Sequence, residues 1–408
     1  MSKKSFLIYM FFIFTVYLLT FQYFLENQIP ILKNIDEFYA FLFIPVLFSK
    51  INKKKFLSKD NIKVVILILL IIILGIISNF IFKYQKITYV LMDIVLFLKF
   101  FFAVGLSTYL FNGELIEKYN NKIKFHVQFI IIILFFSTIL NYLFYLWPNS
   151  NIRFGIMPNQ IFFGHPTKLS AVLFFLLTLY NIVKKGKFDL FYILISIMIF
   201  TTLRMKAILA LIVSLFVIYY VGKKQNKINF KKLTIVGILI CLLGFNSFEY
   251  YFMSDGFARA ELLKSSFKIA KDYFPLGTGF GTFGSWASGV SYSPVYYQYG
   301  LNKVWGISPY NYLAIADSFW PTVLGQFGYL GLTLYLIVIL KMFGNIQKEY
   351  CNNYKYIYSS KLIAFVYLII SSTSESAFFN QLAVPLGIII GLNFNKIYKE
   401  SEKNGANI

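Results

Sequence analysis

The stretch VVILILLIIILGIISNFIF, residues 64–82, decides the fold class of this chain. A run of about 18 or more apolar residues is long enough to cross the hydrocarbon core of a bilayer as a helix. Similar runs recur along the 408 residues, of which 58% are hydrophobic and only 14% are charged, with a mean hydropathy of +0.66. Soluble domains carry roughly 25% charged residues. The sequence therefore predicts an all-α, polytopic membrane protein.

Twelve apolar segments are predicted to cross the membrane as helices. They are 5–25, 38–49, 64–82, 88–111, 127–147, 167–183, 189–203, 207–221, 233–247, 318–340, 362–374 and 378–394. The first segment follows Lys3 and Lys4, and no small-residue cleavage site follows its apolar stretch. We therefore interpret it as a retained span and not as a removed signal peptide.

The distribution of basic residues predicts the orientation of these spans. Lysine and arginine are retained on the cytoplasmic side, and 26 of the 39 basic residues lie near the two termini or in alternate connections between spans. Both termini are therefore predicted to be cytoplasmic. The same short basic clusters account for the net charge of +22 without a nucleic-acid partner.

This topology places one large loop, residues 248–317, on the outer face, between nine spans in 1–247 and three spans with a cytoplasmic tail in 318–408. A smaller outer loop covers 148–166. Asp255 is predicted to cap a helix in the large loop. The apolar residues that follow it at the helical period are Ala260, Leu263, Phe267, Ala270 and Phe274. Such a helix can lie on the membrane surface, cover the bundle or serve only as packing.

Four basic residues of the outer face are candidates for binding a pyrophosphate group: Arg153, Arg204, Lys206 and Arg259. A guanidinium group binds phosphate through two hydrogen bonds, and a lysine adds a point charge. The alternative is that each is an interfacial side chain whose charged end reaches water. Asp317 and Glu375 lie at the outer edges of late spans, and Asp317 could also serve as the N-cap of the following span.

Three further features each allow two interpretations. The glycine run PLGTGFGTFGSWASG, residues 275–289, could form a backbone nest for phosphate or a flexible turn. The tyrosine-rich stretch after it, which contains Trp305, suits both sugar stacking and a membrane interface. Asp93 and Lys99 within one span could form a structural ion pair or line a translocation path.

Metal and nucleotide cofactors are not predicted. The two histidines are His126 and His165, and the sequence has no histidine or cysteine spacing typical of a metal site and no phosphate-binding loop of the ATPase type.

Four segments, in their order along the chain, resemble motifs of the O-antigen polymerase/ligase superfamily of bacterial membrane proteins. RFGIMPNQ (153–160) is similar to the family's Arg-Phe-Gly and Pro-Asn stretch, and TTLRMKAILALIV (201–213) to its Thr-x-Ser-Arg-Gly-Ala run. ARAELLKSSFKIAKDYFPLGTGFGTF (258–283) is similar to the arginine, helix and Pro-Leu-x-Gly-x-Gly element. ADSFWPTVLGQFGYLGL (316–332) resembles the element that opens the span after the loop, with Asp317 and Ser318 where ligases have His and Asn.

The resemblance implies a helical membrane glycosyltransferase of the bacterial plasma membrane that polymerises lipid-linked polysaccharide repeat units, as in capsule or O-antigen synthesis. The donor would be an undecaprenyl-pyrophosphate-linked oligosaccharide, and a sugar on another lipid-linked unit would be the acceptor. Membrane lipids, a chain-length regulator and a flippase would be partners, and neither cofactor nor metal would be needed.

The resemblance also suggests roles for residues. Arg204, Arg259 and Arg153, with Lys206, would bind the pyrophosphate, and Asp317, followed by Glu261 and His165, would be candidates for the general base. The alternative functions are a flippase or other transporter, and a ligase that moves the finished glycan to another acceptor.

Overall fold

The computed structural model describes residues 3–51, 59–153, 155–224 and 256–394, with the isolated positions 227, 228, 232 and 237. Within these ranges the chain forms helices and no strand. The helices are α1 (Lys3–Gln28), η1 (Pro30–Asn34), α2 (Ile35–Phe41), α3 (Phe43–Ile51), α4 (Lys59–Phe82), α5 (Ile87–Leu110), α6 (Gly113–Lys118), α7 (Asn120–Phe144), η2 (Ile161–Phe163), α8 (Pro166–Val183), α9 (Leu190–Thr201), α10 (Met205–Lys224), α12 (Ala258–Asp272), α13 (Trp286–Val290), α14 (Pro294–Gln298), η3 (Leu301–Lys303), α15 (Phe319–Lys348), η4 (Asn352–Tyr354), α16 (Lys355–Ser372) and α17 (Ala383–Gly391).

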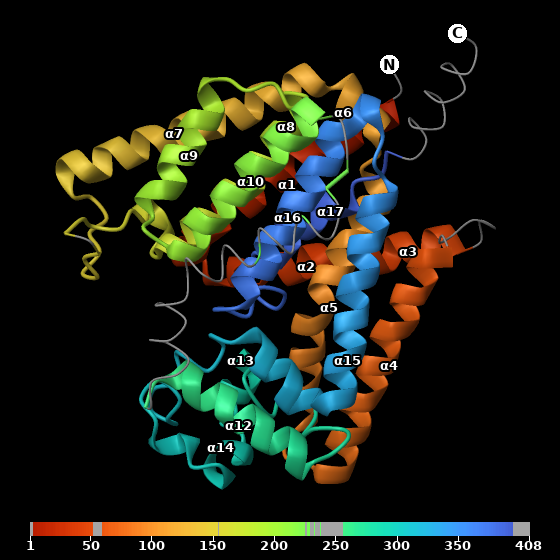
Figure 1. Cartoon of the computed structure of the whole chain (residues 1–408), viewed down its shortest axis with the longest axis vertical. Coiled ribbons are helices and arrows are strands. Elements are labelled where there is room, and N and C mark those ends of the chain that lie inside the picture. Colours follow the sequence, from red (N-terminus) through yellow and green to blue (C-terminus); the bar gives the residue numbers. More distant parts are fainter. Residues whose placement is uncertain are drawn as a thin grey trace.

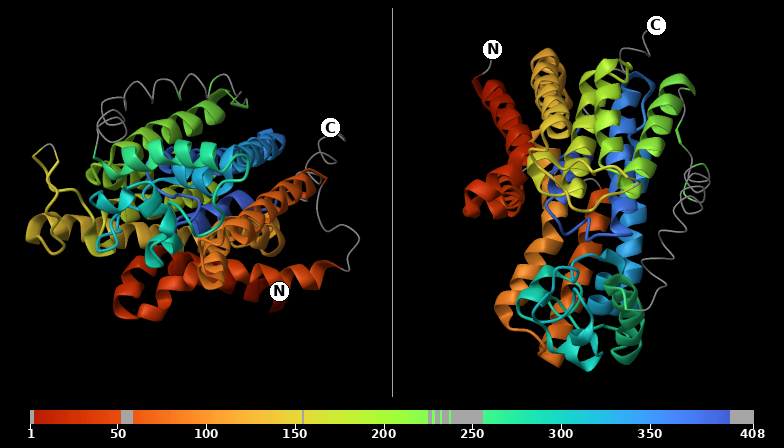
Figure 2. Two further views of the ribbon diagram at one scale, coloured as in Figure 1. Left: turned by 90° about the horizontal axis from the view of Figure 1, so that it is seen from below. Right: turned by 90° about the vertical axis from the view of Figure 1, so that its left-hand side faces the viewer.

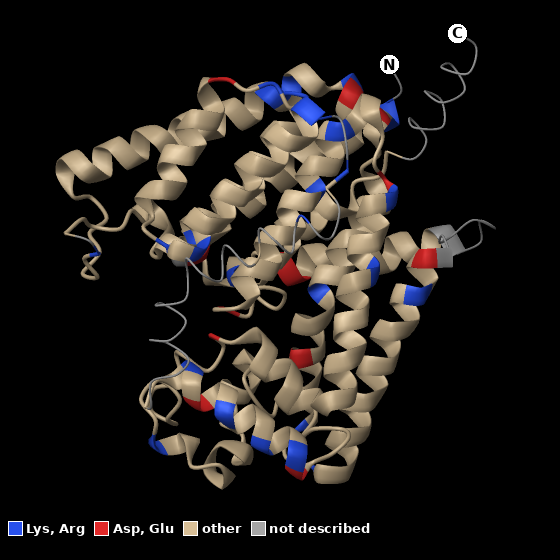
Figure 3. Cartoon of the chain, in the orientation of Figure 1, with Lys and Arg blue, Asp and Glu red and all other residues tan. Residues whose placement is uncertain are grey.

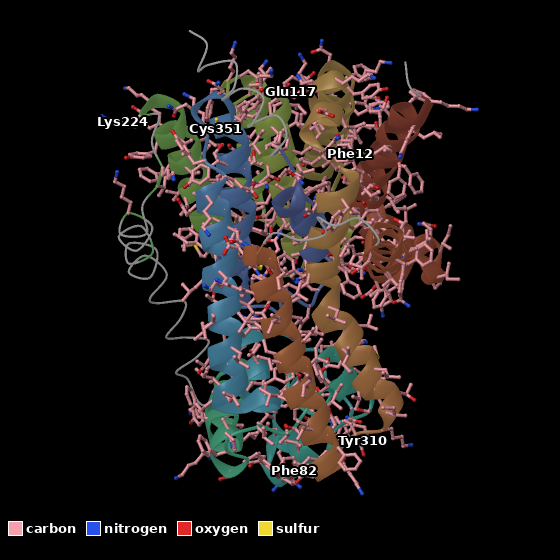
Figure 4. All side chains as sticks on the ribbon, turned by 90° about the vertical axis from the view of Figure 1, so that its right-hand side faces the viewer. Phe12, Phe82, Glu117, Lys224, Tyr310 and Cys351 are labelled. Atoms are coloured by element: carbon pink, nitrogen blue, oxygen red, sulfur yellow. The ribbon has the colours of Figure 1, made fainter. Side chains whose placement is uncertain are left out.

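The molecule has two parts, a helical bundle and a smaller domain built from the large loop. In Figure 1 the bundle contains α1, α7, α8, α9, α10, α16 and α17, and α12 to α14 lie beyond one end of it. Three long helices, α4, α5 and α15, reach from the bundle to the loop domain, and the right-hand view of Figure 2 shows the same arrangement. Figure 4 places Glu117, Lys224 and Cys351 at one end of the molecule and Phe82 and Tyr310 at the other.

Seven of the described helices are long and apolar enough to cross a membrane: α1, α4, α5, α7, α8, α10 and α15. The most apolar is α4, with a mean hydropathy of 3.2. It turns large apolar side chains outward, including Ile73, which is 51% exposed, and Phe80, which is 78% exposed. Water would disfavour this surface, whereas lipid tails would not. The chain is therefore an all-helical, polytopic membrane protein.

The other five predicted spans correspond to shorter or different structures. Segments 189–203 and 362–374 coincide with α9 and with part of α16, and 378–394 contains the nine-residue helix α17. Segment 38–49 is divided into α2 and α3 at Leu42. Apart from Gly237, segment 233–247 lies outside the described residues.

The loop domain has a hydrophobic core of its own, which includes Leu262, Ile269, Phe283, Tyr296 and Ile307. The prediction of a helix in this loop corresponds to α12, but its details were partly wrong. Phe257 is the N-cap, without a side-chain cap hydrogen bond, and Asp255 lies outside the described residues.

The apolar face that the sequence indicates for α12 is only partly buried. Ala260 and Ala270 are buried, whereas Phe267 is 52% exposed and Phe274 is 70% exposed. Small residues such as Ser266 share the buried face, because α12 packs along α15 and small side chains allow close contact.

The glycine run is neither a phosphate nest nor a flexible turn; it is a buried anchor between α4, α5 and α15. Asn79 of α4 accepts a hydrogen bond from the backbone N–H of Phe280 (2.8 Å) and donates one to its carbonyl oxygen (2.9 Å). Asp93 of α5 accepts from the N–H of Gly281 (2.6 Å). Backbone donors that phosphate would need are thus bound to protein, and the anchor fixes the loop domain to the long helices.

Candidate functional site

A cavity of about 1380 Å³ lies where the ends of the bundle helices meet the loop domain. It is lined from α1, α5, the 148–166 loop, the first turns of α8 and α10, α12, α13 and the loop between α16 and α17. Small-molecule sites commonly measure ~300–1,000 Å³, so this cavity has room for a larger ligand. The acidic, basic and histidine residues that line it are Glu26, Lys33, Glu37, Lys99, Arg153, His165, Lys168, Arg204, Lys206, Arg259, Asp317 and Glu375.

Six of the seven residues selected from the sequence line this one cavity: Arg153, His165, Arg204, Lys206, Arg259 and Asp317. They come from four separate segments of the chain. Among the described lining residues, basic side chains outnumber acidic ones, seven to four. Figure 3 shows basic segments at the ends of the bundle helices that face the loop domain, with acidic segments close by. The cavity therefore favours an anionic ligand.

Glu261 is the selected residue that does not line the cavity. It lies in the first turn of α12, accepts a hydrogen bond from the backbone N–H of Gly256 (3.3 Å) and has Lys264 at 3.9 Å. This position suits a carboxylate near a helix N-terminus.

Three helices begin at the cavity and direct the positive ends of their dipoles toward it. Thr167 and Lys168 of α8, Met205 and Lys206 of α10, and Arg259 in the first turn of α12 are all lining residues. Helix N-termini attract anions through their backbone N–H groups and dipoles. The cations and the dipoles therefore act in the same direction.

The tight hairpin between α9 and α10 is held by the 148–166 loop. Arg153 donates from Nη1 to the carbonyl oxygen of Leu203 (3.3 Å), and Leu203 has a left-handed φ of +51°. The buried side chain of Asn159 fixes that loop from behind, because it donates to the hydroxyl of Thr138 in α7 (2.9 Å). This arrangement brings Arg153 and Arg204 to the same side of the cavity.

Arg204 contacts His165 directly, with 2.8 Å between Nη2 and the imidazole Nε2. His165 is the N-cap of α8, where Nδ1 accepts from the backbone N–H of Thr167 (3.3 Å). Partial burial, together with the cations Arg204 and Lys206, lowers the pKa of the His165 imidazole to about 4. The ring is therefore neutral at physiological pH, and it is a weak proton acceptor.

Two of the selected cations form ion pairs with carboxylates of the cavity. Lys206 pairs with Glu375 (2.8 Å), and Arg259 pairs with Asp317 (3.1 Å). Burial raises the pKa of the Asp317 carboxyl group above its ordinary value, although Arg259 opposes this effect. The N-cap of α15 is Ser318 and not Asp317, so the capping interpretation of Asp317 is wrong.

Asp93 and Lys99 do not pair with each other, contrary to the structural-pair interpretation. Lys99 donates to Asp36 and to Glu37, both at 2.8 Å. Asp93 instead accepts from the glycine run and from Gln326 (2.8 Å). The two residues lie about one and a half helical turns apart on α5, so they face different neighbours.

Sequence reasoning missed several lining residues. Lys168 pairs with Glu26 (2.8 Å), which lies near the end of α1, and neither residue was selected. The predicted spans 362–374 and 378–394 left only a three-residue turn, whereas the loop runs from 373 to 382 and supplies eight lining residues. The polar letters TSES and NQ within this apolar region were the available signal.

Metal-binding geometry does not occur in the described part of the chain, where no three His, Cys, Asp or Glu side chains come together. Comparison of the chain with protein-family models, with curated proteins and with solved structures finds no match. The class of the protein is thus defined by its own features: a polytopic membrane protein with a cation-rich cavity beneath a loop domain.

Proposed function

We propose that the protein is a polymerase of lipid-linked polysaccharide repeat units, which transfers a glycan from undecaprenyl pyrophosphate to a sugar on another lipid-linked unit. The observation that carries this proposal is the convergence of Arg153, Arg204, Lys206 and Arg259 on one cavity. Those residues were chosen as cations near membrane depth, and their segments also resemble motifs of the polymerase/ligase superfamily. A resemblance without a common site would not have required them to meet.

The proposed reaction is a displacement at the anomeric carbon of the donor sugar. The bond from this carbon to the pyrophosphate oxygen breaks, and the acceptor hydroxyl oxygen forms the new glycosidic bond. Arg204 and Arg259 would stabilise the charge that develops on the leaving pyrophosphate. The hydroxyl proton would pass to the Asp317 carboxylate, whose raised pKa favours its acceptance.

The proposal includes twelve spans with both termini on the cytoplasmic side of a bacterial plasma membrane. The proposal also includes a change of partner for Arg259, from Asp317 to the pyrophosphate. Asp317 pairs with this guanidinium, and a bound pyrophosphate would compete for it. Asp317 would then lose the interaction that lowers its pKa and would become a stronger base.

A transporter is a weaker alternative. The pair Asp93 and Lys99 was the specific feature that favoured a translocation path, and these residues bind other partners. A ligase remains a related alternative, because it would use the same donor and the same cations with a different acceptor.

The test is complementation of a gene deletion, followed by gel analysis of lipid-linked and surface glycans. Deletion should leave single repeat units, and the wild-type gene should restore the long polymer. Arg204→Lys should fail to restore it at normal protein abundance, because an ammonium group cannot form the two parallel hydrogen bonds of a guanidinium group. Lys303→Ala, an exposed lysine of the loop domain away from the cavity, should restore it fully. Polymer from Arg204→Lys at the wild-type level would contradict the pyrophosphate role.

A further inference from the structure

A second group of lining residues comes from segments that carry no arginine. We call it the polar wall, and define it as Trp286 of α13, Glu37 of α2, and Ser374, Ser376 and Gln381 of the α16–α17 loop. It offers one aromatic ring with hydroxyl, amide and carboxylate groups. Glu37 is paired with Lys99 (2.8 Å), and the wall contains no guanidinium group, so it lacks the paired donors that suit a pyrophosphate.

Trp286 is held firmly at the cavity by its local structure. It is the first residue of α13, where Ser285 and Ser288 form a reciprocal capping box. Its ring packs at a tilt against Tyr312, with 5.7 Å between the ring centroids. Lys33 places its amine 5.2 Å from the ring centroid, a weak contact at an exposed site, which a ligand can displace. The indole is therefore an aromatic surface that its neighbours hold at the cavity.

Three oxygen atoms of the polar wall are buried without a hydrogen-bond partner among the described residues. They are Oε2 of Glu37 and the hydroxyl oxygens of Ser374 and Ser376. Buried polar atoms are normally paired, because an unpaired one loses its hydration without compensation. A ligand with several hydroxyl groups would donate to such oxygens.

Gln381 fixes the α16–α17 loop against the end of α1. Its amide Nε2 donates to Oε2 of Glu26 (2.9 Å) and to the carbonyl oxygen of Lys33 (3.0 Å). Glu26 in turn binds Lys168 of α8. Together with the pair between Glu375 and Lys206, these contacts link the polar wall to the cations of the cavity through one continuous network.

We infer that the polar wall binds the sugar units of the acceptor oligosaccharide, with Trp286 as the stacking platform. The apolar face of a sugar ring would pack on the indole, and its hydroxyl groups would donate to Glu37, Ser374 and Ser376. This inference rests on the proposed function. It assigns two groups of lining residues to two parts of the reaction: the arginines bind pyrophosphate, and the polar wall binds the acceptor sugars. Trp286 takes the sugar-stacking role in place of Trp305, which is 80% exposed and does not line the cavity.

The test measures binding of a carrier-free oligosaccharide to purified protein in lipid nanodiscs by calorimetry. The probe is a neutral fragment of the host surface polysaccharide, released by mild acid and free of lipid and phosphate. We expect Trp286→Ala to weaken its binding about tenfold through loss of the aromatic contact. Trp286→Phe, which keeps a ring, should recover most of the affinity and shows that the site still folds. The matched control Trp305→Ala should bind the fragment as the wild type does.

Undecaprenyl pyrophosphate is the second probe, in the same preparations. Its binding should be weakened by Arg204→Lys and unchanged by Trp286→Ala, whereas fragment binding should be unchanged by Arg204→Lys. Equal fragment affinity in the wild type and Trp286→Ala, or no fragment binding at all while the carrier binds, would overturn the inference and leave the proposed function standing. If neither probe binds the wild type, the proposed function itself fails.

Discussion

The contact between Arg204 and His165 places hydrogen-bond donors against both nitrogens of one ring. A neutral imidazole has one N–H group and one acceptor nitrogen, so it can accept from Arg204 or from the N–H of Thr167 but not from both. An anion between Arg204 and His165 would remove this conflict, because it would accept from the guanidinium and from an Nε2–H group. The pair is thus better arranged for binding phosphate than for proton transfer.

The low pKa of His165 predicts an acid-sensitive stability. The folded imidazole binds its proton only near pH 4, whereas an unfolded histidine has a pKa of about 6.5. The neutral ring therefore contributes stability that is complete above about pH 6.5 and is lost as the pH falls toward 4. We expect the Tm of detergent-solubilised protein to fall between pH 7 and pH 5, and His165→Asn to reduce this fall while it still caps α8. An equal fall in His165→Asn would show that other groups cause the sensitivity.

Asp317 and Glu261 were both candidates for the general base, and the structure separates them. Asp317 lines the cavity and Glu261 does not. We expect Asp317→Asn to fold at normal abundance, because asparagine can still accept a hydrogen bond from Arg259, but to lose long polymer on gels, because an amide takes no proton at neutral pH. Glu261→Gln should retain polymer. Loss of polymer from Glu261→Gln together with normal polymer from Asp317→Asn would assign the general base to Glu261 instead.

At the scale of elements, the glycine run shows that a sequence motif alone does not determine its structural role. Gly277, Gly279 and Gly281 all have left-handed φ values, which suits either a nest or a tight turn. The neighbours decide between these possibilities. A side chain at Gly277 would place its Cβ 2.5 Å from the backbone nitrogen of Gly328, at the kink of α15. The run is glycine-rich because three helices approach its backbone closely.

This close approach can be tested with two alanine variants of matched backbone conformation. Gly277 has a φ of +72° and Gly300 a φ of +69°, but a Cβ at Gly300 would meet nothing within 4 Å. Both variants pay a similar conformational cost, and only Gly277→Ala adds a steric clash, worth about 1–3 kcal/mol in a packed core. We expect a lower Tm and less folded protein for Gly277→Ala than for Gly300→Ala. Equal losses would show that the anchor is loosely packed.

At the scale of the whole molecule, different connections lie at the two ends. Glu117, Lys224 and Cys351 lie at the end opposite Phe82 and Tyr310 (Figure 4). The first three belong to or border connections predicted to be cytoplasmic, and the loop domain is at the other end. The cavity lies between the bundle and this domain, so its side of the membrane follows from the orientation of the chain.

Cysteine labelling of intact cells tests this orientation. In a background without Cys241 and Cys351, Trp305→Cys should react with a membrane-impermeant maleimide, because residue 305 is exposed in the loop domain. Lys187→Cys, which is also exposed, lies in the connection between α8 and α9 and should react only after the membrane is opened. Labelling of residue 187 but not of residue 305 in intact cells would reverse the orientation and remove the outer-face cavity.

The sequence by itself determined the fold class. A long apolar run can lie in lipid only as a helix, because its backbone groups must pair within the run whatever its neighbours are. It also indicated the candidate cations, because charged residues near membrane depth are energetically costly and therefore rare. Tertiary structure alone decided which charges meet. Lys99 pairs with Asp36 and not with Asp93, Glu261 lies outside the cavity, and the α16–α17 loop enters it. These facts depend on contacts between segments that are distant in the chain. Local sequence patterns carry information about a residue's own helix but not about the side chains that other helices bring to it.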